Sequence, residues 1–271
     1  MATTPTSTDA YKVAYEPDLV PPIELMRGEG IDVLEEWFRW GEEWSMLLRV
    51  YGCLTRKSNV LEIGCGLGRI AFPLRYVLSA EGSYDGFEIC KPKVEFLEST
   101  FHKKYPHFRF VWANVHNTYY NPTGQIAPQQ YSFPYADESF DVVYAASVFT
   151  HMLPEAAERY FRETARVLRP GGRAVFSCFL LDNYVAGRQR PLGFGRDAFN
   201  FDHTFGAYGN NFAIVVPSNP EQMTAFRLRF LERFAAGAAF EFAQPPVTGF
   251  WSGATATWVG MQDLLVLQKP S

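Results

Sequence analysis

The fold is decided by the stretch Asn59-Val60-Leu61-Glu62-Ile63-Gly64-Cys65-Gly66-Leu67-Gly68-Arg69, in which a short apolar run enters a glycine-rich turn. A continuous apolar run is typical of a central parallel strand, because both faces of such a strand are covered. Alternating glycines predict a sharp turn after it, since glycine adopts backbone conformations that other residues avoid. From Arg69 onward the pattern predicts a helix, whose unpaired N–H groups point back over the turn. We therefore expect a polar ligand at this turn.

The spacing of the glycines distinguishes between two classes of ligand-binding motif. The dinucleotide fingerprint G-x-G-x-x-G needs its third glycine at position 69, where this chain has Arg69. Here the spacing is G-x-G-x-G, and Glu62 precedes the first glycine by two residues. A carboxylate at a strand end suits ammonium or hydroxyl groups better than a pyrophosphate. The motif E-x-G-x-G-x-G resembles the first motif of class I S-adenosylmethionine (SAM)-dependent methyltransferases, although an ordinary tight turn also fits it.

Composition restricts the class of protein. A chain of 271 residues with 47% hydrophobic residues can form one large domain with a substantial core. A net charge of −4 and a pI near 5.8 do not provide the basic surface of nucleic-acid-binding proteins. Without a membrane-spanning apolar run or a signal-peptide pattern, we expect a cytoplasmic protein that binds neither nucleic acid nor membrane. The four cysteines lack zinc-site spacing, so no metal site is predicted, and the sequence indicates no oligomeric state.

Polar residues end the next two predicted strands. The run Tyr84-Asp85-Gly86-Phe87-Glu88-Ile89 predicts a strand that ends at Glu88. Doubly wound folds place a carboxylate for ribose hydroxyls about 20 residues after the glycine turn, which is where Glu88 lies. The third predicted strand, Phe108–Ala113, is followed by Asn114 and Val115. The methyltransferases that this chain resembles commonly have Asp at position 114 to bind the adenine amino group, and the amide oxygen of Asn114 can accept the same bond.

Further motifs follow in order. The run S-F-D-V-V enters the predicted fourth strand at 138–146, and Ser147-Val148-Phe149-Thr150-His151-Met152-Leu153-Pro154 leaves its C-terminal end. Open α/β sheets bind ligands at that end. The run R-V-L-R-P-G-G then ends a helix, and a fifth strand is predicted at 173–181. The resemblance to the methyltransferases now extends over positions 26–182, and several motifs in the same order are far more specific than one.

The resemblance implies a single α/β domain over residues 1–271. We expect a doubly wound, Rossmann-like, mostly parallel seven-stranded sheet with an antiparallel terminal strand. Its expected parts are a mobile tail (1–20), a helical lid (23–57), a SAM-binding core (58–182), a cap insertion (183–219) and the C-terminal part of the sheet (220–271). The aromatic stripe of the lid helix fits core packing equally well. A helix is predicted at 221–234, and a terminal pair of strands at 240–242 and 263–267.

The resemblance also implies a set of cofactor contacts. The glycine turn would approach the amino-acid part of SAM, Glu88 would bind the ribose, and Asn114 the adenine edge. Ser147 would flank the methionine end, and Arg27 could pair with the SAM carboxylate if the lid closes. The expected cofactor-binding residues are Arg27, Glu62, Gly64, Cys65, Gly66, Arg69, Glu88, Ile89, Asn114, Val115 and Ser147.

His151 is the candidate catalytic base, because an imidazole with an ordinary pKa of about 6.5 can accept a proton at neutral pH. The favoured alternative is a histidine that packs or hydrogen-bonds locally at the start of the following helix, since many methyltransferases need no dedicated base. The sequence places His151 just after the strand end that faces the expected crevice.

We expect an enzyme of specialised metabolism that transfers a methyl group from SAM to a small, hydrophobic or aromatic metabolite and releases S-adenosylhomocysteine (SAH). The protein would mainly hold two substrates in line in a desolvated pocket. The acceptor atom, O, N, C or S, stays open. Two other hypotheses remain. The glycine spacing and Glu62 oppose a nicotinamide-dependent oxidoreductase, and a filled acceptor pocket would favour a non-catalytic SAM-binding protein.

Overall fold

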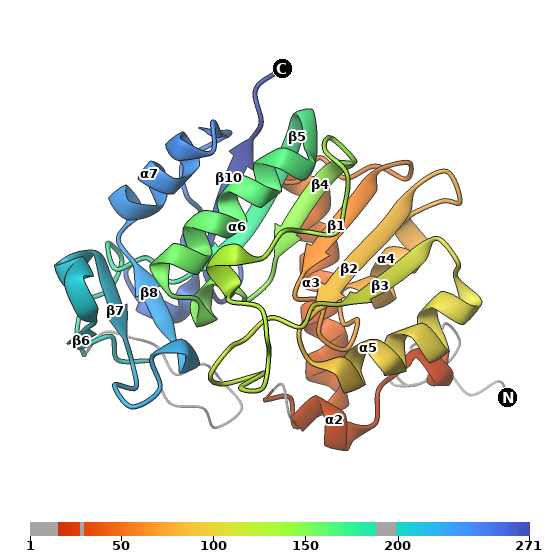
Figure 1. Ribbon diagram of the computed structural model, residues 1–271, viewed down its shortest axis with the longest axis horizontal. Coiled ribbons are helices and arrows are strands. Elements are labelled where there is room, and N and C mark those ends of the chain that lie inside the picture. Colours follow the sequence, from red (N-terminus) through yellow and green to blue (C-terminus); the bar gives the residue numbers. More distant parts are fainter. Residues whose placement is uncertain (1–15, 28–29, 188–198) are drawn as a thin grey trace, which may run out of the picture.

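A seven-stranded sheet forms the centre of the molecule (Figure 1). The computed structural model describes residues 16–27, 30–187 and 199–271. The strands of the sheet are β1 (Asn59–Ile63), β2 (Ser83–Glu88), β3 (Phe108–Trp112), β4 (Phe140–Ala145), β5 (Leu168–Cys178), β9 (Glu241–Phe242) and β10 (Asp263–Gln268). Their order is β3-β2-β1-β4-β5-β10-β9; β1 to β5 run parallel, whereas β10 is antiparallel to β5 and to β9. The predicted mostly parallel sheet with an antiparallel end strand is confirmed.

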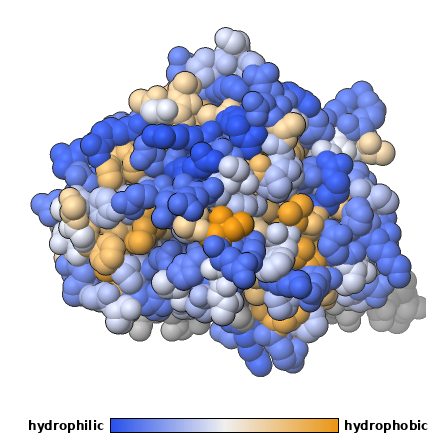
Figure 2. Space-filling view, in the orientation of Figure 1, coloured by the Kyte–Doolittle hydropathy of each residue, from blue (hydrophilic) through white to orange (hydrophobic). Residues whose placement is uncertain are grey.

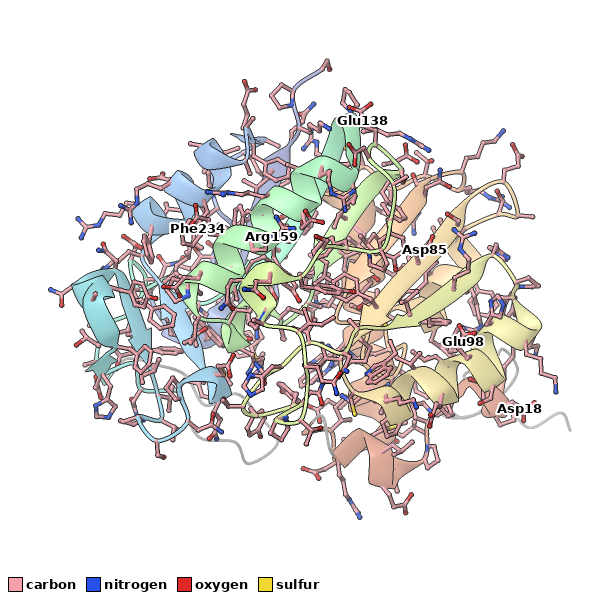
Figure 3. All side chains as sticks on the ribbon, in the orientation of Figure 1. Asp18, Asp85, Glu98, Glu138, Arg159 and Phe234 are labelled. Carbon is pink, nitrogen blue, oxygen red and sulfur yellow. The ribbon has the colours of Figure 1, made fainter. Side chains whose placement is uncertain are left out.

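Helices cover both faces of the sheet. On one face lie α3 (Leu34–Val50), α4 (Ala71–Val77) and α5 (Lys91–Leu97); on the other lie α6 (Pro154–Val167) and α7 (Leu228–Gly237). Successive residues of β4 alternate between the two cores: Tyr144 packs with the first group of helices, and Ala145 with the second. Phe234 of α7, which is labelled in Figure 3, lies edge-on to Phe161 of α6, and the ring centroids are 6.0 Å apart.

The region predicted as a helical lid is part of the core. It contains α2 (Ile23–Arg27) and α3, and the Trp44 ring of α3 stacks on Tyr144 with centroids 5.8 Å apart. A Cβ added at Gly41 would lie 2.3 Å from the Arg69 carbonyl oxygen, so only glycine lets α3 approach the glycine turn this closely. For α3, core packing is therefore the observed arrangement. Residues 28 and 29, between α2 and α3, lie outside the described residues.

The expectation of a mobile tail over 1–20 is wrong for its last part. Pro17–Leu19 form a short 3-10 helix, and the Leu19 side chain is completely buried. The Glu16 carboxylate accepts hydrogen bonds from Arg75 at 2.6 Å and from the Tyr105 hydroxyl. A single buried leucine and this ion pair fix a segment whose composition resembles a tail. Residues 1–15 lie outside the described part of the chain.

The expected cap contains a second, small sheet of β6 (His203–Thr204), β7 (Phe212–Ile214) and β8 (Thr224–Phe226). The helix predicted at 221–234 begins only at Leu228, and β8 occupies the earlier part. The three-residue spacing of Met223 and Phe226 suggested a helix, but Phe226 N–H donates to the Phe179 carbonyl, which gives the backbone a strand partner. Residues 188–198 of the expected cap insertion lie outside the described ranges.

The described residues include no helix with both the length and the apolar character needed to cross a bilayer. Figure 2 shows a largely hydrophilic face with scattered apolar patches.

Candidate functional site

A cavity of about 480 Å³ opens at the C-terminal ends of β1, β2 and β4. Ligand pockets for small molecules typically measure about 300–1,000 Å³. The predicted site residues that line it are Arg27, Glu62, Gly64, Cys65, Gly66, Arg69, Glu88, Ile89, Val115, Ser147 and His151. The topology predicted from the sequence thus brings residues from five separate segments to one site.

Asn114 is the exception, because it does not line this cavity. Its carbonyl oxygen accepts hydrogen bonds from the N–H groups of Gln125 and Ile126, both at 3.0 Å. These bonds close a loop after β3, and the following residues Val115, His116 and Asn117 face the cavity instead. The expected adenine contact through Asn114 therefore has no support in this geometry.

The glycine turn and Glu88 form one rigid unit. The N–H groups of Gly64 and Cys65 both donate to the Phe87 carbonyl, at 2.9 and 3.1 Å. The Glu88 carboxylate, which is 6% exposed, accepts from Gly66 N–H at 3.0 Å and from Cys90 N–H at 2.8 Å. These bonds fix the carboxylate at the cavity wall, and its remaining lone pairs suit the hydroxyl groups of a ribose.

Glu62 is held by two tyrosines that the sequence reasoning missed. One of its oxygens accepts from the Tyr84 hydroxyl on β2 and from the Tyr144 hydroxyl on β4, the latter at 2.7 Å. Burial, with the neighbouring Glu62 charge, raises the pKa of both tyrosines well above the usual range, so both remain donors. The only signal in the sequence is one tyrosine in each of the strands β2 and β4. This arrangement keeps a buried negative charge, suited to an ammonium group, at the end of β1.

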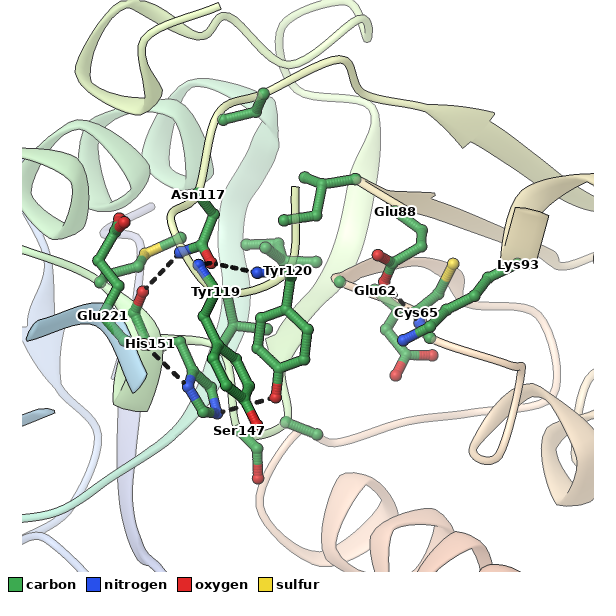
Figure 4. Close-up of a pocket in the computed structure, with 18 of the residues that line it drawn as sticks. Glu62, Cys65, Glu88, Lys93, Asn117, Tyr119, Tyr120, Ser147, His151 and Glu221 are labelled. Atoms are coloured by element: carbon green, nitrogen blue, oxygen red, sulfur yellow. Dashed lines mark hydrogen bonds between the residues drawn. The ribbon is translucent and has the colours of Figure 1, made fainter. Parts of the chain in front are cut away.

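His151 lies in the 3-10 turn Phe149–His151 and is neutral (Figure 4). Burial lowers its pKa to about 4, which outweighs hydrogen bonding to backbone carbonyls. Its Nδ1 lies 3.2 Å from the Glu221 carbonyl oxygen. Because a carbonyl can only accept, Nδ1 carries the proton and Nε2 presents a lone pair. The Tyr120 hydroxyl lies 3.4 Å from Nε2, which makes it a weak donor there.

A short loop places two tyrosines over His151. Asn117 Oδ1 accepts from the N–H groups of Tyr119 and Tyr120, at 3.0 and 2.9 Å, and its Nδ2 donates to the His151 carbonyl at 3.1 Å. The Tyr119 ring is parallel to the imidazole, with centroids 6.2 Å apart. In Figure 4 Tyr120 lies between the His151 side and the Glu62–Glu88 side of the cavity. None of the site residues expected from the sequence lies in this loop.

The cavity has two chemically different sides. Glu62 and Glu88 provide carboxylates on one side. On the other, the rings of Tyr119 and Tyr120 lie against the imidazole of His151. The aromatic and sulfur-containing side chains of Phe199, Met223 and Met261 also line the cavity. No group of His, Cys, Asp and Glu side chains in the described segments could hold a metal ion.

Comparison with known proteins identifies the family. A model described as "Methyltransferase domain" matches residues 61–176. The chain is 32% identical over 225 residues to 27-O-demethylrifamycin SV methyltransferase of Amycolatopsis mediterranei, covering 79% of this chain and 68% of that protein. The chain belongs to the class I SAM-dependent methyltransferases. It is an enzyme with SAM as its cofactor, and the oxidoreductase and non-catalytic hypotheses are set aside.

Other relatives of this methyltransferase match less of their own length. An arsenite methyltransferase of Aquipseudomonas alcaligenes is 31% identical over 148 residues, 52% of this chain and 40% of that one. A tRNA N(3)-cytidine methyltransferase of Gallus gallus is 27% identical over 122 residues, 42% of this chain and 28% of that one. The solved structure of a SAM-dependent methyltransferase of Methanosarcina mazei superimposes with a TM-score of 0.52 at 18% identity, covering 83% of this chain and 97% of that one. This last likeness concerns the fold alone.

Proposed function

We propose that this methyltransferase is a cytoplasmic enzyme that methylates a small, hydrophobic or aromatic metabolite. The observation that carries the proposal is that aromatic and sulfur-containing side chains, Tyr119, Tyr120, Phe199, Met223 and Met261, line the same cavity as the two carboxylates. Apolar, polarisable side chains such as these bind flat apolar molecules. Similarity to an enzyme named for a rifamycin compound supports a role in specialised metabolism.

The carboxylate side is proposed to hold SAM. Glu62 would pair with the methionyl ammonium, the turn Gly64–Gly66 would approach the amino-acid part, and Glu88 would accept from the ribose hydroxyls. Ile89 and Val115 would contact the adenosine part, and Arg27 remains a candidate partner for the carboxylate. When bound, SAM supplies a methyl group on a positively charged sulfur, which a nucleophile displaces in line.

The His151 side is proposed to orient the acceptor. Its Nε2 lone pair faces the cavity and would accept a hydrogen bond from the group to be methylated, in the place that the Tyr120 hydroxyl occupies at 3.4 Å. The loop that carries Tyr119 and Tyr120 would exclude water from the reacting atoms. The protein's contribution is then mainly positioning in a desolvated site.

Methyl-labelled SAM, incubated with the enzyme and a metabolite extract, tests the proposal. We expect label in an organic-soluble, low-molecular-weight compound identified by mass spectrometry, and much less label with the Glu88→Ala variant at a limiting concentration of SAM. The same reaction with total RNA tests the function named for the tRNA-directed relative. Label in RNA, with none in the metabolite fraction, would overturn the proposal. The net charge of −4 supports the expectation that RNA stays unlabelled.

A further inference from the structure

A closed ring of hydrogen bonds surrounds Ser147 at the end of β4. The Ser147 N–H donates to Ser177 Oγ at 2.8 Å, and Ser177 Oγ donates to Gln262 Oε1 at 2.6 Å. Gln262 Nε2 then donates to Ser147 Oγ at 2.8 Å. Ser177 lies on β5, and Gln262 immediately precedes β10, so three neighbouring strands contribute to the ring. Gln262 also lines the main cavity, although nothing in the sequence indicated it.

The ring determines what the Ser147 hydroxyl can do. Its oxygen already accepts from Gln262, so its own proton is available for a second partner. Among the described residues no group accepts that proton, and Ser147 lines the cavity. Ser147 also has φ +60°, which is unfavourable for a residue other than glycine. The hydrogen bonds of the ring keep it in this conformation, as is common at functional sites.

A positively charged side chain, that of Arg69, lines the cavity together with Ser147. A second cavity, of about 50 Å³, adjoins the first and is lined by Arg69, Ser147 and Gln262, which line the main cavity as well. The Arg69 guanidinium lies 5.1 Å from the centre of the Trp40 ring. Within the described ranges, 16–27, 30–187 and 199–271, no side chain forms a salt bridge with it, although its charge interacts with the Glu43 carboxyl, which also lines the second cavity. A hydroxyl donor and a guanidinium together favour an anionic group.

The Glu62 carboxylate, close to Ser147, favours a ligand group of the opposite charge. Glu62 on β1 pairs in register with Tyr144 on β4, three residues before Ser147. The carboxylate of Glu62 favours a cation, whereas Ser147 and Arg69 favour an anion. The methionyl group of SAM carries an ammonium and a carboxylate on one carbon, so it matches both preferences at once. The sulfonium does not suit a hydroxyl proton, because both are positively polarised.

We propose that Gln262 and Ser177 are positioning residues that hold the Ser147 hydroxyl as a hydrogen-bond donor to the methionyl carboxylate of SAM, with Arg69 as the balancing charge. The inference concerns the methyl donor alone. It is independent of the acceptor proposed above.

Decarboxylated SAM isolates the contact, because it retains the ammonium and the sulfonium and lacks only the carboxylate. We would measure dissociation constants for SAM and decarboxylated SAM by isothermal titration calorimetry. Ser147→Gly removes the hydroxyl and accepts the positive φ without strain. It should weaken SAM binding about tenfold and leave decarboxylated SAM unchanged, since a hydrogen bond to a charged group has about this effect.

Gln262→Glu tests the positioning step. A carboxylate of the same shape cannot donate to Ser147 Oγ and instead attracts its proton, so the same selective loss for SAM is expected. Gln268→Glu, at the far end of β10, is the matched control and should bind both ligands as the wild type does. Equal weakening of SAM and decarboxylated SAM by Ser147→Gly and Gln262→Glu would show a purely structural role and overturn the proposal, as would unchanged SAM binding.

Discussion

Individual residues give the two sides of the cavity different electrostatic character. The carboxyl groups of Glu62 and Glu88 are buried, and each accepts hydrogen bonds from two groups. His151 is neutral because burial lowers its pKa to about 4. A positively charged cofactor is therefore attracted to one side of the cavity, while the other side presents a lone pair without a charge.

Replacing Glu88 by alanine should weaken SAM binding by about 10- to 100-fold. The substitution removes the acceptor for the ribose hydroxyls and also leaves Gly66 N–H and Cys90 N–H without their partner. Isothermal titration with SAM and SAH measures the effect. Glu81→Ala is the control, since Glu81 is exposed and pairs only with the exposed Lys57. Unchanged SAM affinity in Glu88→Ala would remove Glu88 from the site.

His151 should make the protein less stable in mild acid. Its folded pKa of about 4 lies below the usual value of about 6.5, so between these pH values the unfolded chain binds a proton that the folded protein does not. The free energy of unfolding should therefore fall by roughly 3 kcal/mol between pH ~6.5 and pH ~4.

Urea unfolding at a series of pH values measures this loss. We expect a shallower pH dependence in His151→Gln, whereas His203→Gln, which changes an exposed histidine, should keep the wild-type dependence. Coinciding curves for His151→Gln and the wild type would contradict a buried neutral imidazole. Since His151 stays neutral above pH ~5, methyl transfer should also show no loss of rate near pH 6.5 from this residue.

Among the secondary-structure elements, β4 positions residues on both the cofactor side and the acceptor side of the cavity. Its Tyr144 holds Glu62, and the residues after its end include Ser147 and His151. The strand therefore positions groups on the donor and acceptor sides in one rigid piece. Parallel strands whose ends converge allow this, because consecutive residues after the strand face the same crevice.

Tyr144→Phe should lower the free energy of unfolding by about 1–3 kcal/mol and weaken SAM binding. The ring remains, but the buried Glu62 carboxylate loses one of its two hydroxyl donors. Denaturant unfolding and titration with SAM measure the two effects. Tyr51→Phe, at the end of α3, controls for the loss of a hydroxyl elsewhere. Wild-type stability and affinity in Tyr144→Phe would mean that Glu62 does not depend on this bond.

The elements that could be predicted are those with a strong local pattern. The strands β1, β2 and β4, the glycine turn and α6 have apolar runs or periodicity together with glycine or proline boundaries. Gln262 could not be predicted, because its role comes from pairing with a residue 115 positions away. The strand pattern alone could not predict that Asn114 does not line the cavity, because hydrogen bonds from Gln125 and Ile126 to its backbone carbonyl shape the loop after β3. The same limit applies to β8, which pairs with β7 and whose Phe226 N–H donates to the Phe179 carbonyl, since neither partner is adjacent in the sequence.

At the scale of the whole molecule, SAM should stabilise the protein against heat. A ligand that binds only the folded state at about 100 times its dissociation constant adds about 2.7 kcal/mol. For a chain of this size, that corresponds to a rise in Tm of roughly 5–10 °C. Differential scanning fluorimetry with SAM and SAH measures the shift, and NADH is the control that should give none. A rise with NADH equal to that with SAM would contradict a donor-specific cavity.

The small sheet of β6, β7 and β8 is attached at the end of β5, through hydrogen bonds between Phe226 and the backbone of Phe179 and Leu181. The glycine turn and both cofactor-side carboxylates belong instead to β1, β2 and the turn between β1 and α4. Substitutions at the exposed residues of the small sheet, His203 and Thr204, should therefore leave donor recognition unchanged. Such modularity makes the chain evolvable: a library randomised at Gln222 and Met223, which line the cavity next to β8, should produce new acceptor preferences while its members still bind SAM.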